Sequence, residues 1–284
     1  MTEATRPPSE GLSPGSRHPI PVRNPGLDFD AAIPRHWLGG NPIATHFFNG
    51  LNLVFPDGER FFIKAVTDHV GRIDDPALRQ QVSGFFGQEA RHAHEHERYF
   101  DVLRSQDYRI DRFLERFRAF SRACNRWLPR GLRLSMTAGA EHWTATFGAM
   151  ALEDEFLIEH AHPTMRNLIL WHATEEIEHK AVAYDVYQSC RGSWLLRIAG
   201  YALATLILFG WTLAGTRLLL RQDDLPRETL RDARRSLRRL DDGAGLRRIL
   251  ASVAAYLKPG FHPNQTDELP LAHRRLREFG IGTA

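Results

Sequence analysis

Hydrophobic residues recur along this chain at intervals of three and four positions, the spacing that places them on one face of an α-helix. From Pro42 onward this pattern is nearly continuous, and no alternating run bounded by hairpin turns predicts a strand. The sequence therefore predicts an all-α protein. Its helices are expected at 42–54, 57–70, 75–104, 108–127, 131–158, 163–190, 193–221, 226–240 and 243–257.

The segments outside this pattern set the predicted organisation of the chain. Pro56 and the residues after it form a turn signal between the first two helices, and the tail after Phe261 is mostly polar. Residues 1–30 are rich in Pro, Gly and Ser and lack the apolar region of a secretion signal. We expect a disordered or extended arm (1–30), a helical bundle (31–192), a hydrophobic helix (193–221) and C-terminal helices with a tail packed on the bundle (222–284).

The segment 198–216 differs from the other predicted helices because its 19 residues carry no charge. It is just long enough to cross a bilayer, and the flanking arginines with Trp194 and Trp211 could lie at the two interfaces. The alternative is a helix buried against the bundle on all sides. If 198–216 does contact a membrane, the arginine-rich segment 227–239 would follow it on the cytoplasmic side.

Composition narrows the function classes only slightly. The hydrophobic content of 43% and the charged content of 25% are ordinary for a globular protein. The net charge of +3 is too small and too diffuse to indicate nucleic-acid binding. Cys124 and Cys190 form neither a metal-binding spacing nor a disulfide framework, which favours the cytoplasm, at the inner face of the membrane if 198–216 contacts it.

The motif Glu-x-x-His gives the first chemical signal, because residues three apart lie on one face of a helix and can bind the same ion. Chance accounts for about one such pair among 17 glutamates and 14 histidines in 284 residues. The sequence has three: Glu89/His92, Glu159/His162 and Glu176/His179. The second of these precedes a proline at a helix junction and is the pair expected by chance.

Two further glutamates stand in apolar surroundings. Glu141 is the only formally charged residue in the run 134–152, and Glu59 lies in the aromatic sequence FPDGERFF. A carboxylate on an apolar helix is costly to bury unless it is protonated, paired or bound to a metal. These two glutamates therefore add to the evidence from the ExxH pairs.

The four signals alternate along the chain as Glu, ExxH, Glu, ExxH, which is the ligand pattern of a di-iron or di-manganese carboxylate site. Four carboxylates suit two divalent ions, and histidine ligands favour iron or manganese over calcium or magnesium. We predict a ferritin-like four-helix bundle with additional helices and one long hydrophobic helix. Its cofactors would be two iron ions, although a mixed Mn/Fe pair or other divalent metals such as zinc also fit.

Two more histidines share the predicted ligand faces. His172 lies one turn before Glu176 and is interpreted as a direct ligand, whereas His96 is interpreted as a hydrogen-bonding neighbour of the ligands. Glu175 is an alternative to Glu176, but the ExxH register favours Glu176 and leaves Glu175 as a neighbour. The predicted metal ligands are Glu59, Glu89, His92, Glu141, His172, Glu176 and His179.

The residues that carry this chemistry resemble a bacterial family described as predicted metal-dependent hydrolases. The resemblance covers about residues 35 to 265 and rests on the sequences HWLGGNP, FPDGERFF, QEARHAHEH and ATEEIEHKAVAYDVY. The HxxxExxH pattern from His172 to His179 is also similar to the arrangement in arylamine N-oxygenases, which add a third histidine to a di-iron ligand set. Carried over by motif, this similarity implies the same seven ligands. The apolar segment 198–216 departs from those soluble enzymes, so their amine substrates are not carried over.

The ligand pattern favours a non-haem di-iron oxygenase. Such an enzyme would use O₂ as co-substrate and an electron donor to hydroxylate, desaturate or N-oxygenate a hydrophobic or small organic substrate. A lipid-like substrate fits if 198–216 contacts the membrane, and the aromatic candidates for its pocket are Phe62, Phe85, Phe86, Trp143 and Phe147. The alternatives are a two-metal hydrolase of an ester or phosphoester and a non-enzymatic metal-binding or membrane-associated protein. The sequence leaves homo-oligomerisation open.

Overall fold

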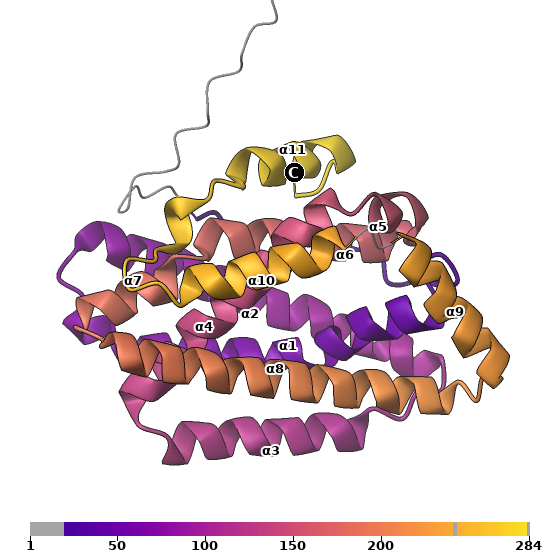
Figure 1. Cartoon of the computed structure of the whole chain (residues 1–284), viewed down its shortest axis with the longest axis horizontal. Helices are drawn as coiled ribbons and strands as arrows, with labels where there is room; N and C mark the ends of the chain where they lie inside the picture. The colour runs from indigo at the N-terminus through magenta and orange to yellow at the C-terminus, as the bar shows by residue number, and fades with distance from the viewer. Residues whose placement is uncertain (1–19, 241–242, 283–284) are drawn as a thin grey trace, which may run out of the picture.

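The computed structural model describes residues 20–240 and 243–282 (Figure 1). Its helices are α1 (Pro42–Thr67), α2 (Pro76–Ser105), α3 (Asp111–Trp127), α4 (Arg130–Glu153), α5 (Glu155–His160), α6 (Pro163–His179), α7 (Val182–Ser189), α8 (Trp194–Gln222), α9 (Arg227–Leu240), α10 (Ala244–Tyr256) and α11 (Leu269–Phe279), with 3-10 turns at η1 (Val70–Arg72) and η2 (Pro263–Gln265). The described residues contain no strand, only an isolated bridge between Leu38 and Ala161. The predicted all-α class is confirmed.

Four helices surround the centre of the molecule. Helices α1 and α6 each contact both α2 and α4, and α8 packs on α1 and α4. In Figure 1, α8 and α10 cross the front of the molecule and α3 runs along its lower edge. The more specific assignment to a ferritin-like bundle stays a prediction.

The apolar core lies on both sides of a polar stretch of α2. Near the start of this helix, Leu78, Val82 and Phe85 belong to a cluster shared with α4, α7 and α8. Near its end, Tyr99 and Leu103 belong to a second cluster shared with the N-terminal segment and α6. The polar residues 88–96 therefore lie between two apolar clusters, which hold this stretch of the helix in place.

Helix α1 is continuous, although the sequence predicted a break at Pro56. Proline lacks the backbone N–H and costs a helix interior about 3 kcal/mol. The helix buries Leu51, Leu53 and Phe61 around Pro56, which is itself buried, and it packs against α2, α3, α4 and α8. The prediction of two helices was wrong because burial on both sides of the proline outweighs its local cost.

Two other predicted helices are each divided in the structure. The predicted helix 131–158 ends at Glu153, and Asp154 caps α5 by accepting a hydrogen bond from the Leu157 N–H. The predicted helix 163–190 is interrupted at 180–181, where the Lys180 ammonium donates to the Thr266 carbonyl and pairs with the Glu268 carboxylate. A local cap at Asp154 thus marks the first of these ends and long-range contacts of Lys180 accompany the second, although the hydrophobic pattern alone would continue both helices.

The tail after Phe261 contains α11, which the sequence analysis did not predict. Ala272 and Leu276 are the buried residues of this short helix, and it packs on α6 and α4. Gly280 ends it with a backbone φ of 62°, in the left-handed region that glycine tolerates best. Two buried side chains were too weak a periodic signal among so many arginines.

Residues 20–30 contain neither helix nor strand, and they lie against α2. A Cβ atom on Gly84 would lie 2.6 Å from the Ile20 carbonyl oxygen, so the two backbones approach closely at this point. Ile20 and Leu27 are buried. Residues 1–19 of the predicted arm lie outside the described residues, and the predicted domain limits stay predictions.

Helix α8 is the described helix that is long and apolar enough to cross a membrane. Length and composition alone are weak evidence, because a core helix can meet the same criteria. One side of α8 is buried, including Tyr201, Ala204, Thr212 and Leu219, and it contacts α4 and α1. The opposite side carries exposed leucines.

Candidate metal centre

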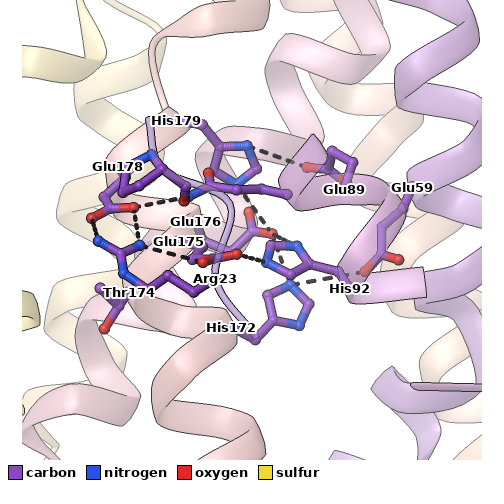
Figure 2. Close-up of polar contacts among 12 residues, drawn as sticks. Arg23, Glu59, Glu89, His92, His172, Thr174, Glu175, Glu176, Glu178 and His179 are labelled. Atoms are coloured by element: carbon purple, nitrogen blue, oxygen red, sulfur yellow. Dashed lines mark hydrogen bonds and ion pairs between the residues drawn. The ribbon is translucent and has the colours of Figure 1, made fainter. Parts of the chain in front are cut away.

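All seven predicted ligands lie together in the centre of the helical assembly, and Figure 2 labels each of them except Glu141. Glu59 comes from α1, Glu89 and His92 from α2, Glu141 from α4, and His172, Glu176 and His179 from α6. Each is at most 5% exposed. The helical spacing therefore collects four carboxylates and three imidazoles in the protein interior, although their roles as ligands stay predictions.

The Glu176 carboxylate lies at the middle of this group. Its Oε1 atom is 2.7 Å from His172 Nε2, 3.5 Å from His179 Nε2 and 3.6 Å from His92 Nδ1. Its other oxygen accepts a hydrogen bond from the Thr144 hydroxyl, which holds the carboxylate in this orientation. This position suits a carboxylate shared between two ions.

The remaining donors form two groups on either side of Glu176. His179 Nδ1 lies 3.3 Å from Glu89 Oε1 and 3.7 Å from Glu141 Oε2. The Glu59 carboxylate lies instead beside His172, at 3.9 Å from Nε2. Within the described residues, the sets Glu89/His92/Glu176/His179 and Glu59/His92/His172 each place their donor atoms within 4.8 Å of one another. Two overlapping sets of donors can hold two neighbouring ions.

The hydrogen bonding of these side chains fits a metal. Among the seven predicted ligands, nine side-chain atoms have no hydrogen-bond partner within the described residues. These atoms belong to Glu59, Glu89, His92, Glu141 and His179. A buried polar group without a partner costs about 1–3 kcal/mol, and native proteins contain few of them. Oxygen and imidazole lone pairs that converge without donors are what divalent cations bind.

The pKa values of the carboxyl groups support the same interpretation. Burial raises the pKa of Glu59, Glu89 and Glu141 well above the ordinary 4.5, and neighbouring carboxylates add to the shift. Burial also opposes ionisation of Glu176, but His179 and His172 outweigh it and hold that pKa well below 4.5. A set of glutamates that resists ionisation without a counter-charge is stabilised in its charged form by bound cations.

A chain of hydrogen bonds from α1 determines which nitrogen of His172 faces the centre. Asn52 donates through Nδ2 to the Phe48 carbonyl, so its Oδ1 atom accepts from His96 Nδ1 at 2.6 Å. His96 Nε2 then accepts from His172 Nδ1, also at 2.6 Å. The Nε2 atom of His172 then faces Glu176, at 2.7 Å from Oε1, and Glu59, at 3.9 Å. His96 thus lies behind His172 as seen from Glu176, and its role as a hydrogen-bonding neighbour of the ligands stays a prediction.

Glu175 orients His92 in the same way. Its Oε2 atom accepts from His92 Nε2 at 3.0 Å, which leaves His92 Nδ1 facing Glu176. Arg23 from the N-terminal segment lies 3.3 Å from the other oxygen of Glu175 and makes two 2.7 Å hydrogen bonds to Glu178 (Figure 2). A carboxylate that orients a ligand histidine and is itself held by an arginine is typical of metal sites.

An apolar pocket adjoins the centre at Glu59. It contains about 680 Å³ of space, part of it open to solvent, and it lies between α1 and α4 on the inside and α3 and α8 on the outside. Its polar lining residues are Glu59, Ser121, Cys124 and Thr144, and the rest are aliphatic or aromatic. An apolar ligand could therefore lie directly beside the donor set.

The predicted aromatic lining is only partly found. Phe62 lines the apolar pocket, and Phe147 lines a smaller one beside His172. Phe85 packs against His179 with ring centroids 5.0 Å apart, and Trp143 packs on Tyr201 in the core. Phe86 is likewise assigned to the core rather than to a pocket.

Several side chains that support the centre were not found from the sequence. Asn52, Thr144 and Arg23 carry no periodic or motif signal, because one hydrogen bond or ion pair to a distant helix leaves no pattern along the chain. Phe55 was also missed, although it packs against both His96 and His172. Phe55 is the first residue of the sequence FPDGERFF, which was an available signal.

A second polar cluster lies at the end of α8. His36 and His46 place their Nε2 atoms 2.7 and 2.6 Å from Asp223 Oδ2, and the Tyr108 hydroxyl also donates to this carboxylate. Burial opposes ionisation of Asp223, but these hydrogen bonds outweigh it and lower its pKa. All three donors are satisfied by one ionised carboxylate, so the cluster fastens α8 to the segment before α1.

The fold and the centre define the class of the protein as a helical protein with buried carboxylate and imidazole groups able to hold metal ions. The family described as "Predicted metal-dependent hydrolase" matches residues 21–267, well over half of the chain. The chain belongs to this family, which confirms the resemblance noted from its motifs. No curated protein and no solved structure matches it. The family's description and the buried donor groups together suggest metal dependence, without identifying the metal.

Proposed function

We propose that the protein is a non-haem di-iron oxygenase acting on an apolar substrate. The observation that carries this proposal is the apolar pocket against Glu59, beside a buried set of four carboxylates and three imidazoles. Two iron ions, when bound, supply the reduction of O₂ and the oxidation of an unactivated substrate. Three imidazoles favour iron or manganese over harder cations such as magnesium.

The residues of the chain then have three tasks. Glu175 and His96 fix the proton positions of His92 and His172, so that each presents an unprotonated nitrogen to the centre. Thr144 orients Glu176 by donating to its outer oxygen. The aromatic and aliphatic pocket lining excludes water and positions an apolar substrate beside Glu59. Turnover also requires an electron donor, which is a proposed partner.

The test is O₂ consumption by protein loaded with Fe(II) under anaerobic conditions. We expect uptake of O₂ when a reductant and a long-chain fatty acid are supplied. The fatty acid should either gain an oxygen atom from ¹⁸O₂ or lose two hydrogens. Glu176→Gln should abolish uptake and metal loading. Glu159→Gln is the matched control, because Glu159 belongs to the remaining ExxH pair and is exposed outside the centre. Full iron loading without O₂ uptake would contradict the proposal.

A two-metal hydrolase is the second candidate, and the family's description favours it. The same donor set could hold two zinc or manganese ions, and a water shared between two such ions is an effective nucleophile for an ester or phosphoester. Ester hydrolysis by zinc-loaded or manganese-loaded protein without O₂ would establish this function. That activity should also be lost in Glu176→Gln and kept in Glu159→Gln.

A further inference from the structure

Helix α8 exposes an apolar stripe along the side that faces away from the bundle. Leu195, Leu206 and Leu213 are 72%, 70% and 57% exposed, and the residues between them on this side are small or apolar. Only 28% of the most apolar part of α8 is buried, whereas the core helix of a soluble protein is mostly buried. An exposed apolar surface of this length is typical of a site that another apolar phase covers.

The packing of α8 argues against a span across a bilayer. Its buried side touches α4 near Gly139 and α1 near Gly50, so it lies lengthwise on the helices that hold the candidate metal ligands. Crossing a membrane would carry those helices and their buried charges into the hydrocarbon. A helix with one buried side and one exposed apolar side lies along a membrane surface instead.

The neighbouring helices add further apolar groups to this side of the molecule. Leu246 and Leu250 on α10 are 60% and 59% exposed. Trp127, at the end of α3, and Trp194, at the start of α8, are also exposed, and tryptophan favours the membrane–water interface. We call α3, α8, α9 and α10 together the basic apolar face.

Charge identifies the surface that the basic apolar face fits. Its four helices contain 16 arginines, of which Arg197 is buried, and 4 acidic residues, a net charge of +12 over the whole helices. The rest of the chain has 21 basic and 30 acidic residues, a net charge of −9, although the whole protein carries only +3. Arginines around an exposed apolar helix are attracted to the headgroups of anionic lipids.

The apolar pocket lies directly behind α3 and α8, two helices of the same face. Phe117 and Phe120 of α3 and Ile207 of α8 form part of its outer wall. Ile207 is next in the chain to the exposed Leu206, so Glu59 lies about one helix diameter, ~10 Å, from the stripe. An acyl chain could pass from a bilayer into this pocket without crossing water.

We propose that the basic apolar face lies on an anionic lipid bilayer, with α8 parallel to its surface, and that the pocket takes an acyl chain from that bilayer between α3 and α8. The acyl chain as substrate rests on the proposed function, whereas the docking of the face does not. The occupant is the bilayer because an apolar stripe bordered by so many arginines matches acyl chains beneath anionic headgroups.

The docking is tested by flotation of the full chain with vesicles. We expect flotation with phosphatidylglycerol/phosphatidylcholine vesicles, little with phosphatidylcholine alone, and release by high salt. The double variant Leu206→Glu/Leu213→Glu should lower vesicle affinity by at least about tenfold. Ala77→Glu/Gln80→Glu, on an exposed part of α2, adds the same charge elsewhere and should bind as the wild type does.

Four results would overturn the docking. The wild type could fail to bind anionic vesicles, or the leucine variant could bind as tightly as the wild type while keeping its helical circular dichroism. Resistance of bound protein to both high salt and alkaline extraction would indicate a span instead. A dimer by light scattering that the leucine variant converts to a monomer, without vesicle binding, would assign the face to a second copy of the chain.

Acyl-chain entry is tested separately with a fluorescent fatty acid and metal-free protein. Ala204→Phe places a ring in the pocket from α8, where Ala204 is 5% exposed. We expect it to weaken binding of the probe about tenfold and to leave vesicle binding unchanged. Equal probe binding by the variant would overturn the entry route. Because neither assay needs turnover, protein that docks and binds the probe but consumes no O₂ would contradict only the proposed function.

Discussion

The three histidines closest to Glu176 differ in how their protons are fixed. His92 donates a hydrogen bond from its outer nitrogen to Glu175, and His172 donates one to His96. Both nitrogens of His179 lack a hydrogen-bond partner among the described residues. Outer hydrogen bonds of this kind fix the tautomer and raise the basicity of a ligand histidine. The orientation of His92 and His172 therefore depends on residues outside the predicted ligand set.

His96 provides a test of this dependence. We expect His96→Leu to weaken metal binding about 10–100-fold without changing the number of ions bound, because His172 loses its acceptor. His94→Leu, an exposed position on the same helix, should leave the affinity unchanged. Isothermal titration with Mn²⁺ or anaerobic Fe²⁺ measures both values. A fall from two bound ions to one would instead make His96 a ligand.

Metal removal should invert the pH dependence of stability. Because Glu59, Glu89 and Glu141 have folded pKa values above 4.5, their protonated forms favour the fold below the unfolded pKa, and this stability is lost as pH rises through the folded values. We expect these three carboxyl groups to raise the Tm of chelated protein as pH falls toward 5, against the opposing effect of the buried His92 and His96, whose pKa values are lowered by burial. The Tm of metal-loaded protein should instead fall as pH falls, since protons compete with the ions. An indicator dye should detect proton release when the metal is added. Parallel Tm curves would contradict this.

The donor set was predictable from the sequence because its residues share a spacing. Glu89 and His92 are three apart on one helix, and Glu141 stands out against apolar neighbours. Asn52 and Arg23 had no such signal, since each acts through a single contact across 44 or 152 residues. Sequence spacing identifies residues that bind together, but not residues that orient others from another helix.

At the scale of helices, tertiary contacts decided what local signals could not. Pro56 indicated a break, yet α1 continues through it because it is packed on several sides. Asp154 ends α4 through a cap that the apolar period across 131–158 concealed. The helix class and most boundaries followed from periodicity. The continuation through Pro56 depended on neighbours that are distant in sequence, whereas the end of α4 is marked by a local cap at Asp154.

The crossing of α1 and α8 depends on Gly50. A Cβ atom at this position would lie 2.5 Å from the Thr212 carbonyl oxygen, and backbone cannot move aside easily. We expect Gly50→Ala to lower the free energy of unfolding by about 1–3 kcal/mol. Gly210→Ala on α8, with nothing within 4 Å, should instead raise it by about 0.5–1 kcal/mol. Urea denaturation distinguishes these outcomes, and equal effects would contradict the close crossing.

At the scale of the whole molecule, Arg23 connects the N-terminal segment to the centre. It makes a bidentate pair with Glu178 and lies beside Glu175, and its side chain is only 16% exposed. We expect Arg23→Met to lower the free energy of unfolding by about 2–4 kcal/mol, because buried carboxylates lose their partner. Metal affinity should fall as well.

Arg91→Met is the control for this prediction. Arg91 is 37% exposed and lies 3.8 Å from Glu95, so its loss should cost less than about 1 kcal/mol. Denaturation with and without metal separates the two effects of Arg23→Met. Unchanged metal affinity with lowered stability would restrict Arg23 to a structural role.

The contact between Arg23 and Glu175 also has a consequence for biosynthesis. The ribosome makes Arg23 before any of the predicted ligands, but its acidic partners emerge 152 and 155 residues later, after most of the donor set. The last predicted ligand, His179, follows almost at once. We therefore expect a nascent chain to hold no complete centre until α6 has emerged, when the segment around Arg23, made before all the predicted ligands, is among the last to find its place.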